Sequence, residues 1–545
     1  MKKIFTLLLI IFLIYSCAKK EEKKILSNGS EKINSAAVEG DWIVLSFPAE
    51  PETLNPIIAS DAYESRVNSY IMESLLERDK ETLELKPLLA DTYYISENKL
   101  EYTFVIKKGI KWHNEIDFTV DDIIYSFERI KDTKVFAPHL RNYYQDVESA
   151  EKIDTYTVRF KCKKKYFLQL DFLGGLPIVC KKVFDNGEDF NKHSAGRHPI
   201  GTGPYIFEEW KTGEKIVLKK NPNYWGEKKY LNKIIIKIIT DSTATLQMLK
   251  RGDIDLTGLE PIQWIQETKS KSFNENFIKL EYFLQNYNFI GWNSKKIFFN
   301  DKRVRWAMTH LLDRQQILDE IYYGYGVLTT GPFYVFSDAY DSTLKPIEYD
   351  IEKAKKLLEE SGWRDTNNNG ILDKNGVEFR FEFLIVSGSR IAEQIATILK
   401  ENLKRVGIEM IIRQLEWATF LNRIDNREFD AVILGWSMGI ESDPYQLWHS
   451  SLANEKNSSN FVSFANKEAD KIIEQAREEF DKEKRNALYR KFHRIIYDEQ
   501  PYTFLFCPKA LGAVHKRFQN VKTYKIRPGY DITEWWVPLN LQKYK

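Results

Sequence analysis

PIGTGPYIFEEWKTGEKIVLKKNPNYW, residues 199–225, is the stretch that most narrows the possible folds of this 545-residue chain. Its GTGPY run places Gly201 and Gly203 in a pattern that could indicate a phosphate-binding loop. Such a loop needs a following helix with free N–H groups, whereas Pro204, which has no N–H, follows directly. We therefore expect a structural turn here and no phosphate site.

Strand and helix patterns on both sides of this stretch mix without regular alternation and without a repeat of fixed period. Thr119 and Asp122 form a capping-box-like start for one helix, and Ile351–Glu360 forms another, which Gly362 ends. Residues 304–321 carry an apolar face and predict a further helix. Runs rich in β-branched and aromatic residues predict strands, so we expect an α/β fold. The predicted strands are residues 102–107, 233–239, 379–386 and 430–436.

The composition is that of a globular protein with more than one core. Hydrophobic residues make up 43% of the chain and charged residues 29%. A chain of 545 residues exceeds what one core accommodates, so we expect two or three lobes. The 80 lysines and arginines nearly balance the 78 aspartates and glutamates, which leaves no basic surplus for nucleic acid. The eight histidines show no metal-binding spacing, and we predict no metal and no cofactor.

The N-terminus predicts secretion and a lipid anchor. Residues 4–15 form an apolar run that is too short to span a membrane and fits a signal-peptide core. The run ends in IYSC (14–17), which resembles a bacterial lipobox, so we expect a signal peptide of residues 1–16 and lipidation of Cys17. The alternative is an ordinary signal peptide with a chance cysteine. Residues 17–40 are rich in charge and predict a flexible tether.

Seven stretches in a fixed order resemble one protein family over essentially all of the mature chain. The chain is similar to the large extracytoplasmic solute-binding proteins for oligopeptides, dipeptides and nickel. One GTGPY motif alone would be a weak signal, whereas seven ordered matches are a strong one. The matching stretches are AEPETLNP (49–56), residues 85–130, residues 199–225, RGDIDL (251–256), residues 299–317, DIEKAKKLLEESGW (350–363) and FDAVILGWSMGIESDP (429–444).

The resemblance implies the two-lobed, flytrap-like fold of periplasmic binding proteins, an α/β fold with mixed sheets and an extra inserted domain. Ligand would be buried between the lobes, and only the closed form would contact it from both sides. Crossings of the chain near residues 285–290 and 509–514 would act as hinges. The implied parts are lobe I (residues 41–62, 195–286 and 512–545), the inserted domain (residues 63–194) and lobe II (residues 287–511).

The resemblance also implies a function. The protein would be the receptor of an ABC importer, capturing oligopeptides and delivering them to the permease subunits in the membrane. We expect a monomer without catalytic activity, held by its lipid anchor in the periplasm or at the outer face of the cytoplasmic membrane. The same receptor class with a dipeptide, an oligosaccharide or a nickel chelate as ligand is the alternative.

Aromatic residues are the expected walls of the ligand site, because they offer contact area with little loss of rotamer freedom. Matching of motifs places two tryptophans and a neighbouring glycine at the cleft, one glutamate in a segment that borders it, and two tyrosines in the inserted domain. Ordinary core packing is the alternative for each aromatic residue. The expected contacts are Glu50, Tyr143, Tyr144, Trp417, Gly435 and Trp436.

The usual acid of the ligand site is missing from its expected position. In close relatives a carboxylate three residues after the tryptophan equivalent to Trp436 holds the ammonium group of the ligand. Here that position is Gly439, and the loop before Pro444 is one residue longer. Either Glu441 or Asp443 replaces the acid, or the ammonium group is not fixed. This departure disfavours small dipeptides held by their ammonium group and leaves longer peptides and oligosaccharides open. The W-S-x-G loop resembles that of receptors for longer oligopeptides, which we therefore favour.

The run GWSMG at residues 435–439 also matches the nucleophile elbow of serine hydrolases. Ser437 would be the nucleophile, with Asp443 and either His493 or His515 as partners. A solute-binding loop is the alternative interpretation of the same residues. A hydrolase is therefore the competing hypothesis from another functional class.

Two further patterns have plain structural alternatives. Residues 365–373 resemble the front of a calcium loop, but position twelve is Gly376 where a bidentate glutamate is needed, so a polar turn is the alternative. Cys162 and Cys180 lie in neighbouring apolar segments. They either pair in an oxidising compartment or stay buried free thiols.

Overall fold

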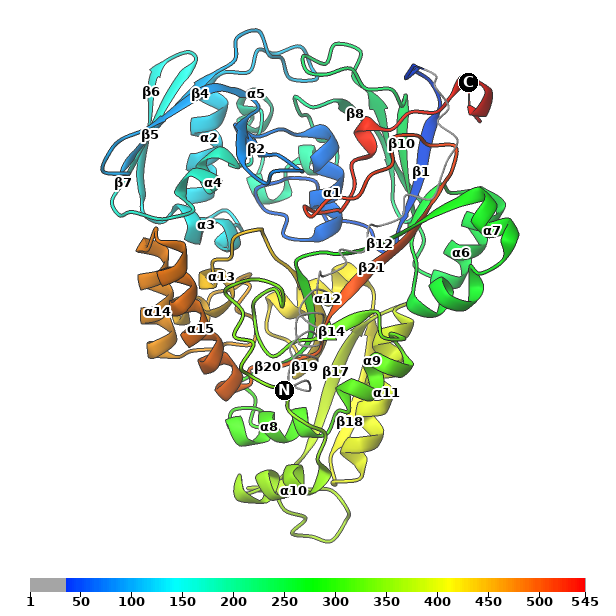
Figure 1. The fold of residues 1–545 in the computed structure, drawn as a ribbon. Helices are drawn as coiled ribbons and strands as arrows, with labels where there is room; N and C mark the ends of the chain where they lie inside the picture. Colours follow the sequence, from blue (N-terminus) through cyan, green and yellow to red (C-terminus); the bar gives the residue numbers. More distant parts are fainter. Residues whose placement is uncertain (1–35, 545) are drawn as a thin grey trace, which may run out of the picture. The chain divides into compact units, whose positions relative to one another are not determined.

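Three main sheets make up most of the β-structure of residues 36–544, which the computed structural model describes (Figure 1). An eight-stranded sheet has the order β12-β21-β11-β1-β10-β9-β8, with β14 paired to β21; a five-stranded sheet has the order β18-β17-β19-β13-β20; a four-stranded sheet has the order β4-β5-β7-β6. Together with the helices packed on it, the eight-stranded sheet forms lobe I. In the same way, the five-stranded sheet forms lobe II and the four-stranded sheet forms the inserted domain. The strands are β1 (Trp42–Phe47), β2 (Leu76–Arg78), β3 (Leu85–Pro87), β4 (Ala90–Ile95), β5 (Glu101–Ile106), β6 (Val147–Asp154), β7 (Thr157–Cys162), β8 (Tyr205–Lys211), β9 (Lys215–Lys220), β10 (Lys233–Ile238), β11 (Leu256–Gly258), β12 (Phe277–Phe283), β13 (Asn286–Trp292), β14 (Gly326–Leu328), β15 (Asp373–Lys374), β16 (Val377–Glu378), β17 (Arg380–Val386), β18 (Glu409–Leu415), β19 (Ala431–Ser437), β20 (Tyr502–Phe504) and β21 (Phe506–His515).

Helices cover these sheets. α11 and α12 pack on the five-stranded sheet, α2 on the four-stranded sheet, and α6 and α7 on the eight-stranded sheet (Figure 1). Within residues 36–544, no helix has the length and apolarity that a membrane crossing needs. The helices are α1 (Ala62–Ile71), α2 (Val120–Lys131), α3 (Pro138–Tyr144), α4 (Gln169–Gly174), α5 (Lys181–Phe184), α6 (Ser242–Arg251), α7 (Lys271–Asn276), α8 (Lys302–His310), α9 (Arg314–Glu320), α10 (Ile351–Glu360), α11 (Arg390–Lys404), α12 (Trp417–Asp425), α13 (Tyr445–Trp448), α14 (Lys467–Glu478) and α15 (Lys482–Glu499).

The strongest local signals of the sequence are confirmed. The four predicted strands are β5, β10, β17 and β19, each within one residue of the expected ends. Thr119 caps α2 in a capping box, and α10 ends before Gly362, whose φ is +91°. The single helix expected over residues 304–321 is wrong: α8 ends at His310, and Asp313 accepts the N–H of Gln316 to start α9. A capping side chain thus interrupts an apolar face that would otherwise continue.

Both faces of the lobe I sheet are buried, which explains the almost continuous apolar run of β10. Ile234 and Ile236 pack with Leu45 in the core on one face. Ile235 packs with Val44 in the core on the other face. Successive side chains of a strand point to opposite faces, so a strand buried on both sides must be apolar at every position.

The GTGPY stretch is a structural turn, as predicted. A Cβ atom on Gly201 or Gly203 would collide with the carbonyl of Ile71 at the end of α1, so only glycine allows this approach. The carboxylate of Glu73, two residues after α1, accepts three side-chain hydrogen bonds of 2.7–2.9 Å from the same stretch. Their donors are Thr202, Tyr224 and Trp225.

The chain passes between lobes I and II through two strand connections. β12 ends at Phe283 and β13 starts at Asn286; β20 ends at Phe504 and β21 starts at Phe506. The second crossing takes place within β21 itself. The first residues of β21, up to Pro508, pair with β14, and the residues from Lys509 onward pair with β12. The predicted limits of the lobes and of the inserted domain stay predictions, since the chain from residue 38 onward forms one compact unit. The signal peptide, Cys17 and most of the tether lie outside the described residues.

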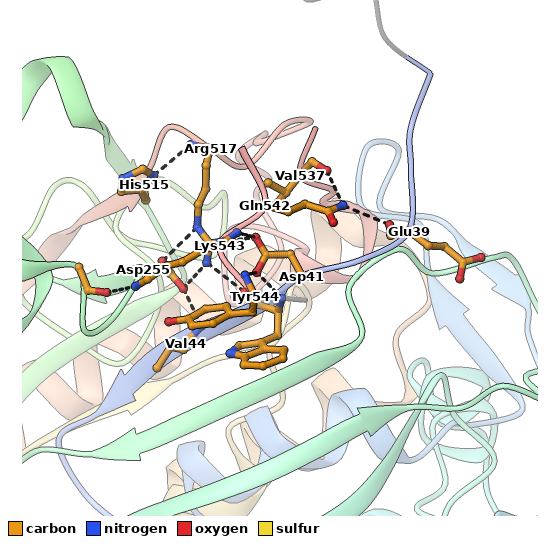
Figure 2. Close-up of polar contacts among 12 residues, drawn as sticks. Glu39, Asp41, Val44, Asp255, His515, Arg517, Val537, Gln542, Lys543 and Tyr544 are labelled. Carbon is orange, nitrogen blue, oxygen red and sulfur yellow. Dashed lines mark hydrogen bonds and ion pairs between the residues drawn. The ribbon is translucent and has the colours of Figure 1, made fainter. Parts of the chain in front are cut away.

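A buried polar cluster joins the start of β1 to the C-terminal segment (Figure 2). The Arg517 guanidinium pairs with Asp41 and, at 2.8 Å, with Asp255, and each of the three side chains is at most 5% exposed. Asp41 also accepts the backbone N–H groups of Lys543 and Tyr544 at 3.0 and 3.2 Å. We call Asp41, Asp255 and Arg517 the clasp. It holds the first strand and the last described residues in one place.

Candidate functional site

A cavity of about 590 Å³ lies between lobe I and lobe II. Lobe I contributes the end of β1, Tyr63 of α1, and the segments around β11 and α6; lobe II contributes Trp417 of α12, Gly435 of β19 and the loop between β17 and α11. The residues at the start of β21, where the chain crosses between the lobes, also line it. Its volume is within the range of about 300–1,000 Å³ that is usual for ligand sites.

The lining is mostly apolar and neutral. Of the described lining residues, Glu260 and Lys509 are the charged ones, and none is a histidine, a cysteine or an aspartate. Glu260 pairs with Arg390 at 2.5 Å, and Lys509 pairs with Glu281 at 2.5 Å. No group of three or more His, Cys, Asp or Glu side chains within residues 36–544 could hold a metal ion. The cavity therefore suits an uncharged or internally neutral ligand surface.

Trp417, an expected wall, lines the cavity. It is the first residue of α12, which Glu416 caps through the N–H groups of Ala418 and Thr419. The Trp417 ring meets the Tyr63 ring of lobe I edge-on, with centroids 5.7 Å apart. The indole N–H is buried and has no hydrogen-bond partner among the described residues. A buried donor without a partner costs free energy, which a ligand acceptor beside the Trp417 ring would recover.

The two neighbours on β19 face opposite ways. Gly435 lines the cavity, as expected. Trp436 packs with Phe289 and Phe461 in the core on the other face of the sheet, and its indole N–H donates to the Tyr502 hydroxyl at 3.2 Å. Trp436 is not among the described residues that line this cavity, whereas Leu434, two positions before it on β19, is.

Glu50 points into its own lobe and is not part of the cavity lining. Its carboxylate accepts hydrogen bonds from the Trp210 indole and, at 2.7 Å, from the Gly213 N–H, and pairs with Arg197 at 3.4 Å. Arg197 also stacks over the Trp210 ring at 3.3 Å. Glu50 thus braces the β8–β9 hairpin, although the chain just before it does border the cavity at Ala49.

The two tyrosines of α3 differ from one another, and neither lines the cavity. Tyr144 is a core residue whose hydroxyl donates to the Phe172 carbonyl at 2.8 Å. Tyr143 stacks on the Phe172 ring at 3.8 Å and donates its hydroxyl to Gln446 of α13 at 2.7 Å. Tyr143 therefore connects the inserted domain to lobe II.

The two acids that could replace the missing carboxylate are both held by arginines. Asp443 is 1% exposed, pairs with Arg477 Nε at 3.1 Å and accepts the Tyr166 hydroxyl at 2.6 Å. Glu441 pairs with Arg485 at 3.5 Å. Gly439 lies in the loop that carries them and does not line the cavity. Neither acid is free for an ammonium group at this cavity.

Asp443 belongs to a contact between lobe II and the inserted domain that sequence reasoning missed. The Arg477 guanidinium lies over the rings of Tyr166 and Tyr445, at 4.4 and 4.5 Å, and donates to the Asn142 carbonyl at 2.9 Å. Burial raises the pKa of Tyr166 well above its usual value, so the hydroxyl stays a donor to Asp443. We call Tyr166, Asp443 and Arg477 the junction. No local pattern marks Arg477, because its partners come from distant segments.

The residues proposed for a hydrolase are not assembled in the described structure. Ser437 ends β19 opposite Asn286, and no helix follows it directly, unlike a nucleophile elbow. The His493 ring hydrogen-bonds to Thr330 Oγ1 and to the Asp341 N–H, each at 3.1 Å, and burial lowers its pKa to about 4. His515 accepts the N–H of Arg517 in lobe I. None of these contacts involves Ser437.

Two other patterns have structural explanations. In the calcium-like run, the side-chain oxygens of Asp365, Asn367 and Asn369 accept backbone N–H groups of the same loop at 2.9–3.1 Å, which makes it a polar turn. Cys162 and Cys180 are buried and unpaired. Burial raises their thiol pKa values to about 12 and about 11, so both stay protonated.

Comparison with known proteins gives one family. Residues 84–458 match the bacterial extracellular solute-binding proteins, family 5 Middle. The oligopeptide-binding protein AppA of Bacillus subtilis (strain 168) is 32% identical over 97% of both chains. The structure of B. subtilis AppA in complex with a nonapeptide superimposes with a TM-score of 0.87 at 31% identity, covering 92% of this chain and all of that one.

A nickel-related protein has the same fold. NikZ from Campylobacter jejuni, solved in complex with Ni(L-His), gives a TM-score of 0.80 at 26% identity and covers 92% of this chain and 100% of its own. The two-lobed fold of periplasmic binding proteins, expected from the sequence, is confirmed by these superpositions. Because the family match covers more than half of the sequence and the similarity to AppA extends over almost all of it, this chain belongs to the bacterial extracellular solute-binding proteins of family 5.

Proposed function

We propose that this chain is the receptor of an ABC importer and captures oligopeptides between lobes I and II. The observation that carries the proposal is the cavity of about 590 Å³ that both lobes line with aromatic, aliphatic and neutral polar groups. A ligand there contacts both lobes at once, so binding favours the arrangement in which they meet. The similarity to AppA, an oligopeptide-binding protein solved with a nonapeptide, supports a peptide of that size class.

The ammonium group of the peptide is not the main point of recognition in this proposal. Asp443 and Glu441 are occupied by Arg477 and Arg485. The Trp417 indole N–H and the backbone around Gly435 offer hydrogen bonds to a peptide main chain. Recognition through backbone and aromatic walls tolerates varied side chains, as a receptor for mixed peptides requires.

Two measurements test the ligand. Mass spectrometry of molecules that co-purify with the mature protein should find extended peptides. Titration calorimetry with one such nonapeptide, free and N-acetylated, should give dissociation constants within about tenfold of each other. A loss of about a hundredfold on acetylation, equivalent to ~2.7 kcal/mol, that disappears in Asp443→Asn or Glu441→Gln, so that the variant binds the free and the acetylated peptide equally, would show that the replaced acid binds the ammonium group.

Other ligands remain outcomes of the same experiment. A dipeptide, an oligosaccharide or a nickel chelate recovered by mass spectrometry would replace the oligopeptide and leave the receptor class unchanged. A nickel chelate carries its own metal ligands, so the lining residues do not exclude it, and no observation on the cavity favours it. No observation on the cavity favours a sugar over a peptide.

The membrane context belongs to the same proposal. We propose that Cys17 carries a lipid, that the protein lies in the periplasm or at the outer face of the cytoplasmic membrane, and that a monomer docks on the permease subunits. Cys17→Ser should release the protein into the soluble fraction, because the acyl chains supply the membrane affinity. Unchanged membrane fractionation would contradict the anchor.

We propose no catalytic activity. In the described part of the chain, His493 and His515 form their hydrogen bonds with residues other than Ser437. A fluorophosphonate probe should leave Ser437 unlabelled, and no esterase or peptidase activity should appear. Stoichiometric labelling that Ser437→Ala abolishes would replace the receptor with the hydrolase.

A further inference from the structure

The charges of the cavity are cancelled in place by ion pairs, and one of these pairs bridges the two lobes. Glu260, which follows β11 in lobe I, lines the cavity and pairs at 2.5 Å with Arg390, the first residue of α11 in lobe II. The Glu260 side chain is 16% exposed and the Arg390 side chain 40%. The carboxylate thus faces the cavity and is in ion-pair contact with Arg390, although Oε2 accepts no hydrogen bond from a described residue.

The second lining charge is also paired. Lys509 of β21 pairs with Glu281 of β12 at 2.5 Å, across the ladder that joins these two strands in lobe I. The Lys509 ammonium also lies 5.5 Å from the ring centroids of Phe283 and Tyr325. Both lining charges are therefore neutralised by residues of the chain itself.

The rest of the lining has no charge to offer a ligand. It consists of aliphatic groups, the Tyr63 and Trp417 rings, and neutral polar groups such as Ser387 and Asn288. An ammonium or carboxylate group of a ligand side chain that entered here would lose water without gaining an opposite charge. Such burial is strongly unfavourable, whereas an aliphatic or aromatic side chain gains from it.

We propose that this cavity selects uncharged side chains of the bound peptide and that Glu260 and Arg390 determine the selectivity. The inference rests on the proposed function and names the peptide class that the cavity takes. Because the two charges cancel only as a pair, removal of either partner leaves the other free beside the cavity. Arg390→Met would then make the cavity accept a cationic side chain, and Glu260→Gln would make it accept an acidic one.

A charge scan of one peptide tests this inference. The probe is a nonapeptide of uncharged residues in which Lys, and separately Glu, replaces each position in turn. Titration calorimetry is run on wild type, Arg390→Met, Glu260→Gln and the double variant. Lys302→Met is the matched control, since Lys302 pairs with Asp498 at 2.6 Å and neither residue lines the cavity.

In wild type, at least one position should lose about tenfold or more in affinity with either charge. At that position Arg390→Met should raise the affinity for the Lys peptide by about tenfold and leave the affinity for the Glu peptide low. Glu260→Gln should raise the affinity for the Glu peptide and leave the affinity for the Lys peptide low. The double variant and Lys302→Met should again disfavour both charges. The double variant also controls for the loss of the bridge between the lobes.

Other outcomes separate the inference from the proposed function. Peptides that bind wild type equally well with and without charge would overturn the inference and leave the peptide receptor intact. A wild-type preference that Arg390→Met and Glu260→Gln leave unchanged would remove these two residues from the specificity. No binding of any peptide would overturn the proposed function, and the inference with it.

Discussion

The clasp and the junction use the same chemistry in two different places. In the clasp, Arg517 is buried between Asp41 and Asp255, and its guanidinium lies 4.5 Å from the Phe518 ring centroid. In the junction, Arg477 pairs with the buried Asp443 and lies over two tyrosine rings. The clasp joins segments of one lobe, whereas the junction joins lobe II to the inserted domain. A buried arginine can therefore serve folding in one place and the meeting of two parts in the other.

The difference follows from what happens when each cluster separates. Opening the clasp breaks contacts within lobe I itself, because Asp41 directly precedes β1 and Asp255 accepts the N–H of Val44 within that strand. The junction can open by movement of the inserted domain against lobe II, and the charges of Asp443 and Arg477 would then regain water. Loss of a partner should therefore destabilise the fold at the clasp and ligand binding at the junction.

The largest effect is expected at the clasp. Arg517→Met should lower the free energy of unfolding by about 3–5 kcal/mol, because two buried carboxylates lose their cation. Denaturant unfolding followed by circular dichroism measures it. Arg251→Met, which breaks the exposed pair with Asp253, should change stability by less than about 1 kcal/mol. Equal stabilities of the two variants would show that the clasp does not hold the fold.

The next effect is expected at the junction. Asp443→Asn should weaken nonapeptide binding by about tenfold to a hundredfold, equivalent to ~1.4–2.7 kcal/mol, because Arg477, without its carboxylate, is covered by Tyr166 and Asn142 of the inserted domain only when the two parts meet. Tyr166→Phe removes a single neutral donor and should cost less. Calorimetry gives the affinities and denaturant unfolding the stability. A large loss of unfolding free energy with unchanged peptide affinity would show that the junction stabilises the fold, as the clasp does, and does not support ligand binding.

Acid should act on stability through a group that belongs to neither cluster. Burial lowers the pKa of His493 to about 4, against about 6.5 in the unfolded chain. Between these values the unfolded state binds the extra proton, so stability falls as pH drops from about 6.5 to about 4, by up to about 1.4 kcal/mol per pH unit.

A variant isolates this contribution. His493→Gln keeps a polar side chain near Thr330 and should flatten the decline of unfolding free energy between pH 6.5 and 4. His113 and His139, whose pKa values burial also lowers to about 4, should maintain the remaining slope. A variant with the wild-type pH profile would show that His493 does not titrate in this range.

The smallest effect separates the two tryptophans. Trp417→Phe should weaken peptide binding by about 0.5–1.5 kcal/mol through loss of the free indole donor, with little change in stability. Trp436→Phe removes the bond to the Tyr502 hydroxyl inside lobe II and should mainly lower stability by a similar amount. The reverse assignment of the two effects would place the ligand on the other face of β19.

Local sequence determined the elements and, through the ordered motifs, the family. The Thr119 capping box, the apolar run of β10 and the glycines before Pro204 each act within a few residues, so their patterns are visible in one dimension. Trp417 and Gly435, which motif matching placed at the cleft, are among the residues that line the cavity, and their role in ligand binding stays a prediction. The single helix expected over residues 304–321 was wrong, because an N-cap at Asp313 overrode the apolar periodicity.

Only the tertiary structure decided which polar groups remain free. Asp443 looked like a candidate for the ligand's ammonium, yet Tyr166, 277 positions away, and Arg477 occupy it. Glu50 is likewise taken up by Trp210, 160 positions along the chain. A carboxylate buried in a fold takes the nearest donor in space, and sequence distance carries no information about that donor. The elements could therefore be predicted from local preferences, whereas the free and paired charges of the site depend on how distant segments meet.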